Sequence, residues 1–265
     1  MTIAPRITRL TIILLILLSW EVMPRIFDMP LILLPPLSTT IEAGIEKRAL
    51  FGEHFLATSS EAAIAVIIAC GLGLIFGLSI GVSQTLSRAF TPLASTIYAI
   101  PIVVLYPLFT VWLGIGSSSK IAFGAFYGFI PTLLTTVAGV GTIPRFYRVV
   151  ANSYAATPFQ KIRFVLVPAA IPTVLSGVRL GGALAIVGVI AAEMLTSTAG
   201  LGFLISQFRT SLDTPAVYFS VICVIFLVVA FEVVMFWLDL FCQRKWTPWK
   251  RRDDDTSRST QLAAA

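Results

Sequence analysis

The stretch that decides the fold is Ala62-Ala-Ile-Ala-Val-Ile-Ile-Ala-Cys-Gly-Leu-Gly-Leu-Ile-Phe-Gly-Leu-Ser-Ile-Gly-Val82, which carries no charged side chain. A bilayer core about 30 Å thick is crossed by roughly 20 apolar residues of helix, so this stretch is long enough to span a membrane. Gly73, Gly77 and Gly81 recur at a spacing of four. Small residues at this spacing let neighbouring spans approach closely, so the stretch predicts a transmembrane helix with a tight packing face.

Further stretches have the same character. They lie between residues 88 and 120, between 120 and 145, at about 174–198 and at about 215–242. The apolar run 12–20 follows Arg6 and Arg9 as the core of a signal peptide would, but no small-x-small cleavage site comes after it. We therefore interpret it as an uncleaved first helix. The prediction is an all-α polytopic membrane protein with six transmembrane helices.

The composition excludes most other classes of protein. Of 265 residues, 57% are hydrophobic and 12% charged, with a mean hydropathy of +0.92, and a soluble domain would need about twice this share of charge. The basic residues behind the net charge of +6 form no patch with interleaved aromatics, so no nucleic-acid partner is expected. The single histidine, His54, cannot supply a metal site or an intramembrane protease, and no phosphate-binding loop is present. We expect no catalytic residue, no metal and no enzyme activity.

The basic residues set the expected orientation. With six spans, both termini share a side with thirteen of them, against five on the other side. Cytoplasmic loops carry the excess of Lys and Arg, so both termini are predicted to be cytoplasmic. Outside, residues 24–56 include the mixed-charge stretch 41–51, which is either an amphipathic surface helix or a plain connector. Inside, residues 141–177 form a loop too long and too apolar for a simple turn.

This inner loop predicts two short helices. Thr157-Pro158-Phe159-Gln160 combines a capping hydroxyl, a proline at the first helical position and a glutamine that completes a capping box. We expect one helix from Pro158 to about Leu166, ending before Pro168, and another over about 144–154. The pair would present an apolar face either to the groove of another protein or to lipid headgroups.

The loop resembles that of the permease subunits of type I ABC importers. Their pattern is Glu-Ala-Ala, three residues, Gly, nine residues, Ile, one residue, Leu-Pro. Here it reads Val149-Val-Ala151, Ala155, Val165 and Val167-Pro168 at the same spacing. Val149 replaces the acid, and Ala155 replaces the glycine, which predicts a turn that needs no positive φ. Further matches to the nitrate, sulfonate and taurine branch are Ile100-Pro101, Tyr106-Pro-Leu108, Trp112-Leu-Gly-Ile-Gly116, Val167-Pro-Ala-Ala-Ile-Pro172, Ser176-Gly-Val-Arg179, Ala192-Glu193 and Gly200-Leu-Gly202.

The resemblance implies a permease in the bacterial plasma (inner) membrane that forms the path for a small organic solute or anion. It implies a separate ABC ATPase that holds ATP and Mg²⁺, a second copy of the permease, and an extracytoplasmic solute-binding protein. It also implies three segments: a first helix and outer segment at 1–56, a permease core at 57–241 and a basic tail at 242–265. The alternative is a secondary transporter or channel that works without an ATPase.

Two sets of site residues follow. Cytoplasmic coupling helices would contact the ATPase through Tyr154, Ala155, Ala156, Thr157, Pro158, Phe159, Gln160 and Lys161. Pro101 and Pro107 are expected to kink or break the third span, where freed carbonyls can line a cavity or the prolines serve packing alone. Arg179 and Glu193 lie fourteen residues apart, about 21 Å along a helix. They either contact headgroups and the outer surface as edge residues, or face the bundle and position solute or helices.

Overall fold

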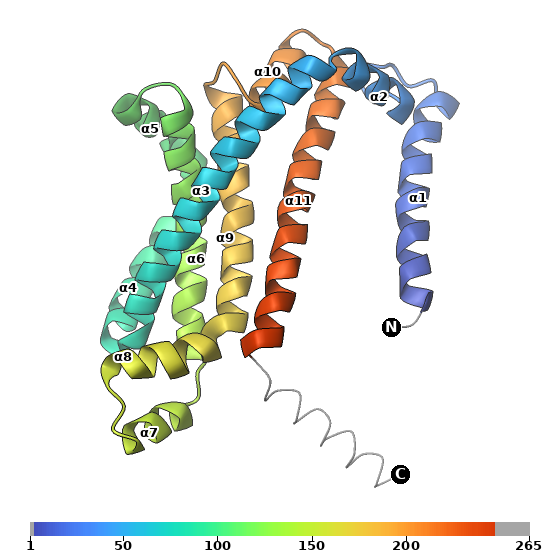
Figure 1. Ribbon diagram of the computed structural model, residues 1–265. Coiled ribbons are helices and arrows are strands. Elements are labelled where there is room, and N and C mark those ends of the chain that lie inside the picture. Colours follow the sequence, from blue (N-terminus) through green and yellow to red (C-terminus); the bar gives the residue numbers. More distant parts are fainter. Residues whose placement is uncertain (1–2, 247–265) are drawn as a thin grey trace. The chain divides into compact units, whose positions relative to one another are not determined.

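The computed structural model describes residues 3–246, and these contain helices and no strand (Figure 1). Their order is α1 (Ile3–Ile26), α2 (Leu37–Glu46), α3 (Arg48–Val82), α4 (Gln84–Ala99), the 3₁₀ helix η1 (Ile102–Leu105), α5 (Tyr106–Leu113), α6 (Ser117–Gly141), α7 (Arg145–Ser153), α8 (Pro158–Lys161), the π-helix η2 (Ile162–Leu166), α9 (Val167–Leu195), α10 (Leu201–Thr210) and α11 (Thr214–Trp246).

The described helices confirm an all-α polytopic membrane protein. Four of them, α3, α6, α9 from Pro168 and α11 up to Cys242, are long and apolar enough to cross a membrane. A fifth span is available if α4 and the segment Ile102–Leu113 count as one, although the two are bent by 82°. The helix α1 has 24 residues, about 36 Å at 1.5 Å per residue. Six spans therefore stay a prediction that depends on α1.

The bend in the third span lies at Pro101. Ile100 ends α4 in an extended conformation, with ψ at 137°, because the residue before a proline avoids the helical region. Pro107 does not break a helix, since it stands in the first turn of α5, where a missing N–H is tolerated. One of the two prolines thus interrupts the span and the other begins its next segment.

The chain divides into two compact units, which are described separately. Unit 1 is Met1–Glu61 with Ile190–Leu227, and unit 2 is Ala62–Val189 with Val228–Ala265. In unit 2, α6 lies beside α3 (Figure 1), and the two helices pack through the predicted glycine face. A Cβ atom added to Gly73 or Gly77 would stand 2.6 Å from the Cβ of Thr132 or Thr136. Two spans therefore approach as closely as their backbones allow, as the spacing of the glycines predicts.

An adjacent face of α6 packs against α9 in the same way, and Thr132 contacts both neighbouring helices. Added Cβ atoms at Gly177 and Gly188 would lie 2.8 Å from Thr135 and 3.0 Å from Tyr127, respectively. Thr132 itself is fully buried, and its hydroxyl donates to the Gly128 carbonyl at 2.8 Å. Because the threonine hydroxyls bond within α6, their methyl groups are left to fill the glycine faces. Dispersion contacts of this kind are what hold spans together in lipid.

In unit 1, the stretch 41–51 is helical. It is divided between α2 and the start of α3, with Lys47 between them. Lys47 forms an ion pair with Asp213 at 2.7 Å, and Phe51 packs with Leu204, Phe208 and Ala216. These contacts attach the beginning of α3 to α10 and α11.

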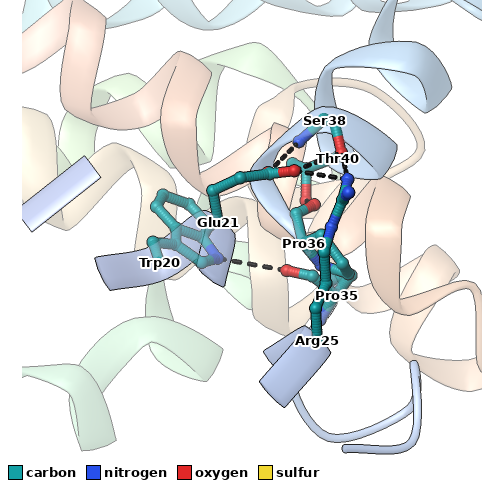
Figure 2. Close-up of polar contacts among 7 residues, drawn as sticks. All are labelled: Trp20, Glu21, Arg25, Pro35, Pro36, Ser38 and Thr40. Atoms are coloured by element: carbon teal, nitrogen blue, oxygen red, sulfur yellow. Dashed lines mark hydrogen bonds and ion pairs between the residues drawn. The ribbon is translucent and has the colours of Figure 1, made fainter. Parts of the chain in front are cut away.

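The end of α1 is attached to the start of α2 by polar contacts (Figure 2). The Trp20 indole N–H donates to the Pro35 carbonyl at 3.1 Å. The Glu21 carboxylate accepts from the Ser38 backbone N–H at 2.9 Å and from its hydroxyl at 3.0 Å, and Arg25 forms an ion pair with Glu21. Because a helix N-terminus favours a nearby anion, Glu21 stabilises the first turn of α2.

Candidate functional site

The two helices predicted in the inner loop are present as α7 and α8. The second differs from the prediction, because α8 ends at Lys161 and continues as the π-helix η2 up to Leu166, where α9 begins at once. The helical path therefore changes type before Pro168 and does not stop there. Proline at position 168 removes the N–H that would bond to residue 164, and the wider π turn accommodates its ring.

The predicted capping box closes the start of α8. The backbone N–H of Thr157 donates to Gln160 Oε1 at 2.8 Å, and the N–H of Gln160 donates to Thr157 Oγ1 at 3.3 Å. Two amides at the helix start are satisfied by residues of the same turn.

The prediction for Ala155 is wrong. Its φ is +51°, although alanine replaces the family's glycine. The Ala156 N–H donates to the Ala151 carbonyl at 3.1 Å, five residues back. This six-to-one bond around a left-handed residue is the Schellman ending of a helix, so the geometry of the α7 terminus sets the sign of φ. Alanine adopts that conformation at a cost of about 1–2 kcal/mol.

A groove of about 500 Å³ lies between these helices. Three of its aromatic side chains are strongly exposed: Phe146 at 70%, Tyr154 at 83% and Phe164 at 68%. The other lining residues are Tyr147, Val150, Ala151, Ala156, Gln160 and Val165. Of the predicted contact residues, Tyr154, Ala156 and Gln160 thus line the groove, while the side chains of Pro158 and Phe159 lie outside the described residues. Phe146 and Phe164 fall outside the predicted set, although the mixture of basic and aromatic residues in both short helices was the sequence signal that could have found them.

Glu193 belongs to a different cluster, in unit 1. Glu193 is 1% exposed, and its carboxylate accepts from the Gly202 backbone N–H at 2.9 Å. The Thr58 hydroxyl donates to both carboxylate oxygens, at 2.9 and 3.0 Å, and accepts from the Leu201 N–H at 2.7 Å. The buried His54 accepts at Nδ1 from the Gly200 N–H at 2.8 Å. Three side chains, two of them more than 140 residues away in the sequence, therefore bind three successive amides at the start of α10.

Arg179 lies in unit 2 and is paired with Glu232 of α11. Together with Asp239 and Ser176 it lines a cavity of about 230 Å³ between α9 and α11. Arg179 and Glu193 thus belong to separate clusters. Sequence reasoning did not single out Thr58 and Glu232 as their partners, or His54 as a member of the Glu193 cluster. Among the described residues, no three His, Cys, Asp or Glu side chains come together as a metal-ligand set would.

The chain is similar to known transport proteins. The family described as "Binding-protein-dependent transport system inner membrane component" matches residues 69–247. The riboflavin transport system permease protein RibX of Chloroflexus aurantiacus is 31% identical over 78% of each chain. The taurine permease protein TauC of Escherichia coli is 28% identical over 90% of this chain and 88% of its own.

Two further comparisons agree. The formylaminopyrimidine permease protein ThiX of Halalkalibacterium halodurans is 28% identical over 77% of this chain and 82% of its own. Among solved structures, a chain from an inward-facing form of the MetNI methionine ABC transporter superposes with a TM-score of 0.67 and 16% identity, covering 74% of this chain and 98% of that one. At this identity the structural likeness bears on the fold alone.

Proposed function

We propose, from the premise that this chain belongs to the family of binding-protein-dependent transport system inner membrane components, that it forms the membrane path of an ABC importer for a small organic solute or anion. The relatives are named for taurine, riboflavin and a formylaminopyrimidine. These solutes share small size and hydrogen-bonding groups and have no common charge. We place solute choice mainly in a separate binding protein at the outer face.

The chain works with partners in this proposal. It has no phosphate-binding loop, so ATP and Mg²⁺ are held by a separate ATPase and the chain itself is not an enzyme. A second copy completes the path. With α1 as the sixth span, both termini and the loop 141–177 are cytoplasmic, in agreement with the distribution of basic residues.

The single observation that carries the coupling role is the groove between α7 and α8. Three exposed aromatic rings surround it, and the helix start beside it is capped within its own turn. Full burial of one aromatic side chain contributes roughly 2–3 kcal/mol at 25 cal/mol per Å². An ATPase surface that receives Tyr154 and its neighbours would gain this free energy, and the capped turn would transmit its movement to η2 and α9.

The remaining predicted residues receive supporting roles. The bend at Pro101, with Pro107 at the start of α5, frees carbonyls that can face the path. Arg179 holds α9 to α11 through Glu232. We keep the division into a first helix and outer segment at 1–56, a permease core at 57–241 and a cytoplasmic basic tail at 242–265.

The coupling role is tested with Tyr154→Asp and Phe159→Asp, each purified with a tagged ATPase. A buried, unpaired aspartate reverses the gain from burial and adds a desolvation penalty. We therefore expect the ATPase to be lost, or retained without ATP-driven uptake of taurine, riboflavin or nitrate, whichever the unmodified complex imports. Gln84→Asp, an exposed position at the start of α4, is the matched control. Full ATPase stoichiometry and unchanged uptake in both loop variants would assign this loop to the lipid headgroups.

A further inference from the structure

The helix α10 cannot cap its own N-terminus. Its N-cap residue is Gly200, which has no side chain to accept a hydrogen bond and makes none. The first amides of a helix need acceptors from somewhere, since an amide without one is costly when buried. Here the acceptors come from Thr58 and His54 on α3 and from Glu193 on α9.

The packing around Glu193 leaves no space for a side chain at position 200 or 202. Gly200 has a φ of +114°, and an added Cβ would overlap the Glu193 carboxyl group. A Cβ at Gly202 would stand 2.7 Å from the Cβ of Glu193. The Gly200-Leu-Gly202 motif therefore lets the chain close directly over the carboxylate. Its negative charge stabilises the positive end of the α10 dipole, and more strongly in a buried site than in water.

A second set of contacts fastens the next turns of α10. The Ser206 hydroxyl donates to the Met194 carbonyl near the end of α9, at 3.0 Å. Phe203 stacks on the His54 ring with 5.7 Å between centroids, and Phe208 lies 5.9 Å from Phe51. The polar contact thus holds α10 to the end of α9, and the two aromatic contacts hold it to the first turns of α3.

We propose that Glu193, with Thr58 and His54, is a positioning group that makes α10 and the outer end of α9 one rigid piece. The proposal rests on the proposed function in one respect, because it takes the coupling helices to be moved by the ATPase. The helix α9 is continuous from Val167 to Leu195 and begins where η2 ends. Movement imposed on the coupling helices would then reach α10 through α9 and this cap, and α10 would move with α9 when the importer changes state.

Hydrogen exchange tests the cap in the complex of chain, ATPase and binding protein without nucleotide. Thr58→Val removes the hydroxyl that joins Leu201 to Glu193, and Glu193→Gln removes the charge. A hydrogen bond to a charged group contributes about 1.5–3 kcal/mol, so we expect the Gly200–Gly202 amides to exchange about tenfold or more faster in both variants. Thr58→Ser should restore slow exchange. Thr210→Val, whose hydroxyl bonds only within α10 at 2.9 Å in the described contacts, is the matched control.

Spin labels test the rigid joint. Nitroxides at Leu195 and Gln207, in a background with the three native cysteines replaced by alanine, report the separation of α9 and α10 by dipolar broadening. For the unmodified chain and for Thr58→Ser, we expect the same broadening in the nucleotide-free and the ATP–vanadate-trapped complex. For Thr58→Val, we expect the broadening to differ between these two states.

Two results would overturn the proposal. One is exchange in Thr58→Val no faster than in Thr210→Val, and the other is broadening that changes on trapping in the unmodified complex. A complex that hydrolyses no ATP would contradict the proposed function, while the exchange measurement, which needs no nucleotide, would still decide the role of the cap.

Discussion

The starts of α8 and α10 are both capped, but by different kinds of neighbour. At α8 the partners are Thr157 and Gln160, three residues apart in the chain. At α10 the side chains that bind Gly200 and Leu201 lie 146 and 143 residues away. A local cap stays intact when its helix moves against the rest of the molecule, whereas a distant cap must break or move along. The cap of α8 is thus of the kind that the proposed coupling movement would leave intact, whereas α10 is tied to α3 and α9.

The largest effect is expected from a substitution that disrupts the distant cap of α10 by filling the space at Gly200. Gly200→Ala places a methyl group on the Glu193 carboxyl group and puts an L side chain at a φ of +114°. The variant therefore has a strained backbone at residue 200 and loses the hydrogen bonds of the cap. We expect a loss of about 3–5 kcal/mol. The melting temperature of the purified chain should fall by about 10 °C.

Gly114→Ala is the control for the Gly200 variant. Gly114 also has a positive φ, +79°, but an added Cβ meets nothing within 4 Å. Only the conformational penalty applies, about 1–2 kcal/mol. Equal falls in melting temperature for the two variants would show that the cap contributes nothing at Gly200.

A smaller effect is expected at the local cap. Thr157→Ala removes the hydroxyl that accepts from the Gln160 N–H, and loss of such a cap costs about 1 kcal/mol. The Gln160 amide should exchange about fivefold faster, while amides of α10 keep their rates. Thr157→Ser should behave as the unmodified chain does. Faster exchange in α10 as well would mean that the two helix starts are not independent.

The same contrast explains how much the sequence could predict. The spans α3, α6, α9 and α11, the bend at Pro101 and the family follow from apolar length, prolines and motif spacing. The capping box of α8 was predictable because all its atoms come from one turn. The partners of Glu193 were not, because hydropathy identifies a span without saying which of its faces meets which neighbour.

One motif and one single residue show what sequence patterns leave undetermined. Gly200-Leu-Gly202 matched a family motif, but its physical reason, the closeness of the Glu193 carboxylate, exists only in three dimensions. Glu232 is one of two acids late in a span, and only the packing of α11 on α9 selects it for Arg179. Motifs therefore marked the right segments, and tertiary contacts gave the residues their roles.

The smallest expected effect concerns Ala155, where prediction and structure disagree. Its φ of +51° costs alanine about 1–2 kcal/mol, whereas glycine adopts this conformation freely but loses more chain entropy on folding, about 0.5–1 kcal/mol. Ala155→Gly should therefore stabilise the end of α7 by about 0.5 kcal/mol, and the Ala156 amide should exchange about twofold more slowly. Ala151→Gly, the same substitution inside α7, has the opposite expected sign, because glycine in a helix interior costs about 1 kcal/mol. Destabilisation by both variants would mean that the turn between α7 and α8 does not hold residue 155 at positive φ.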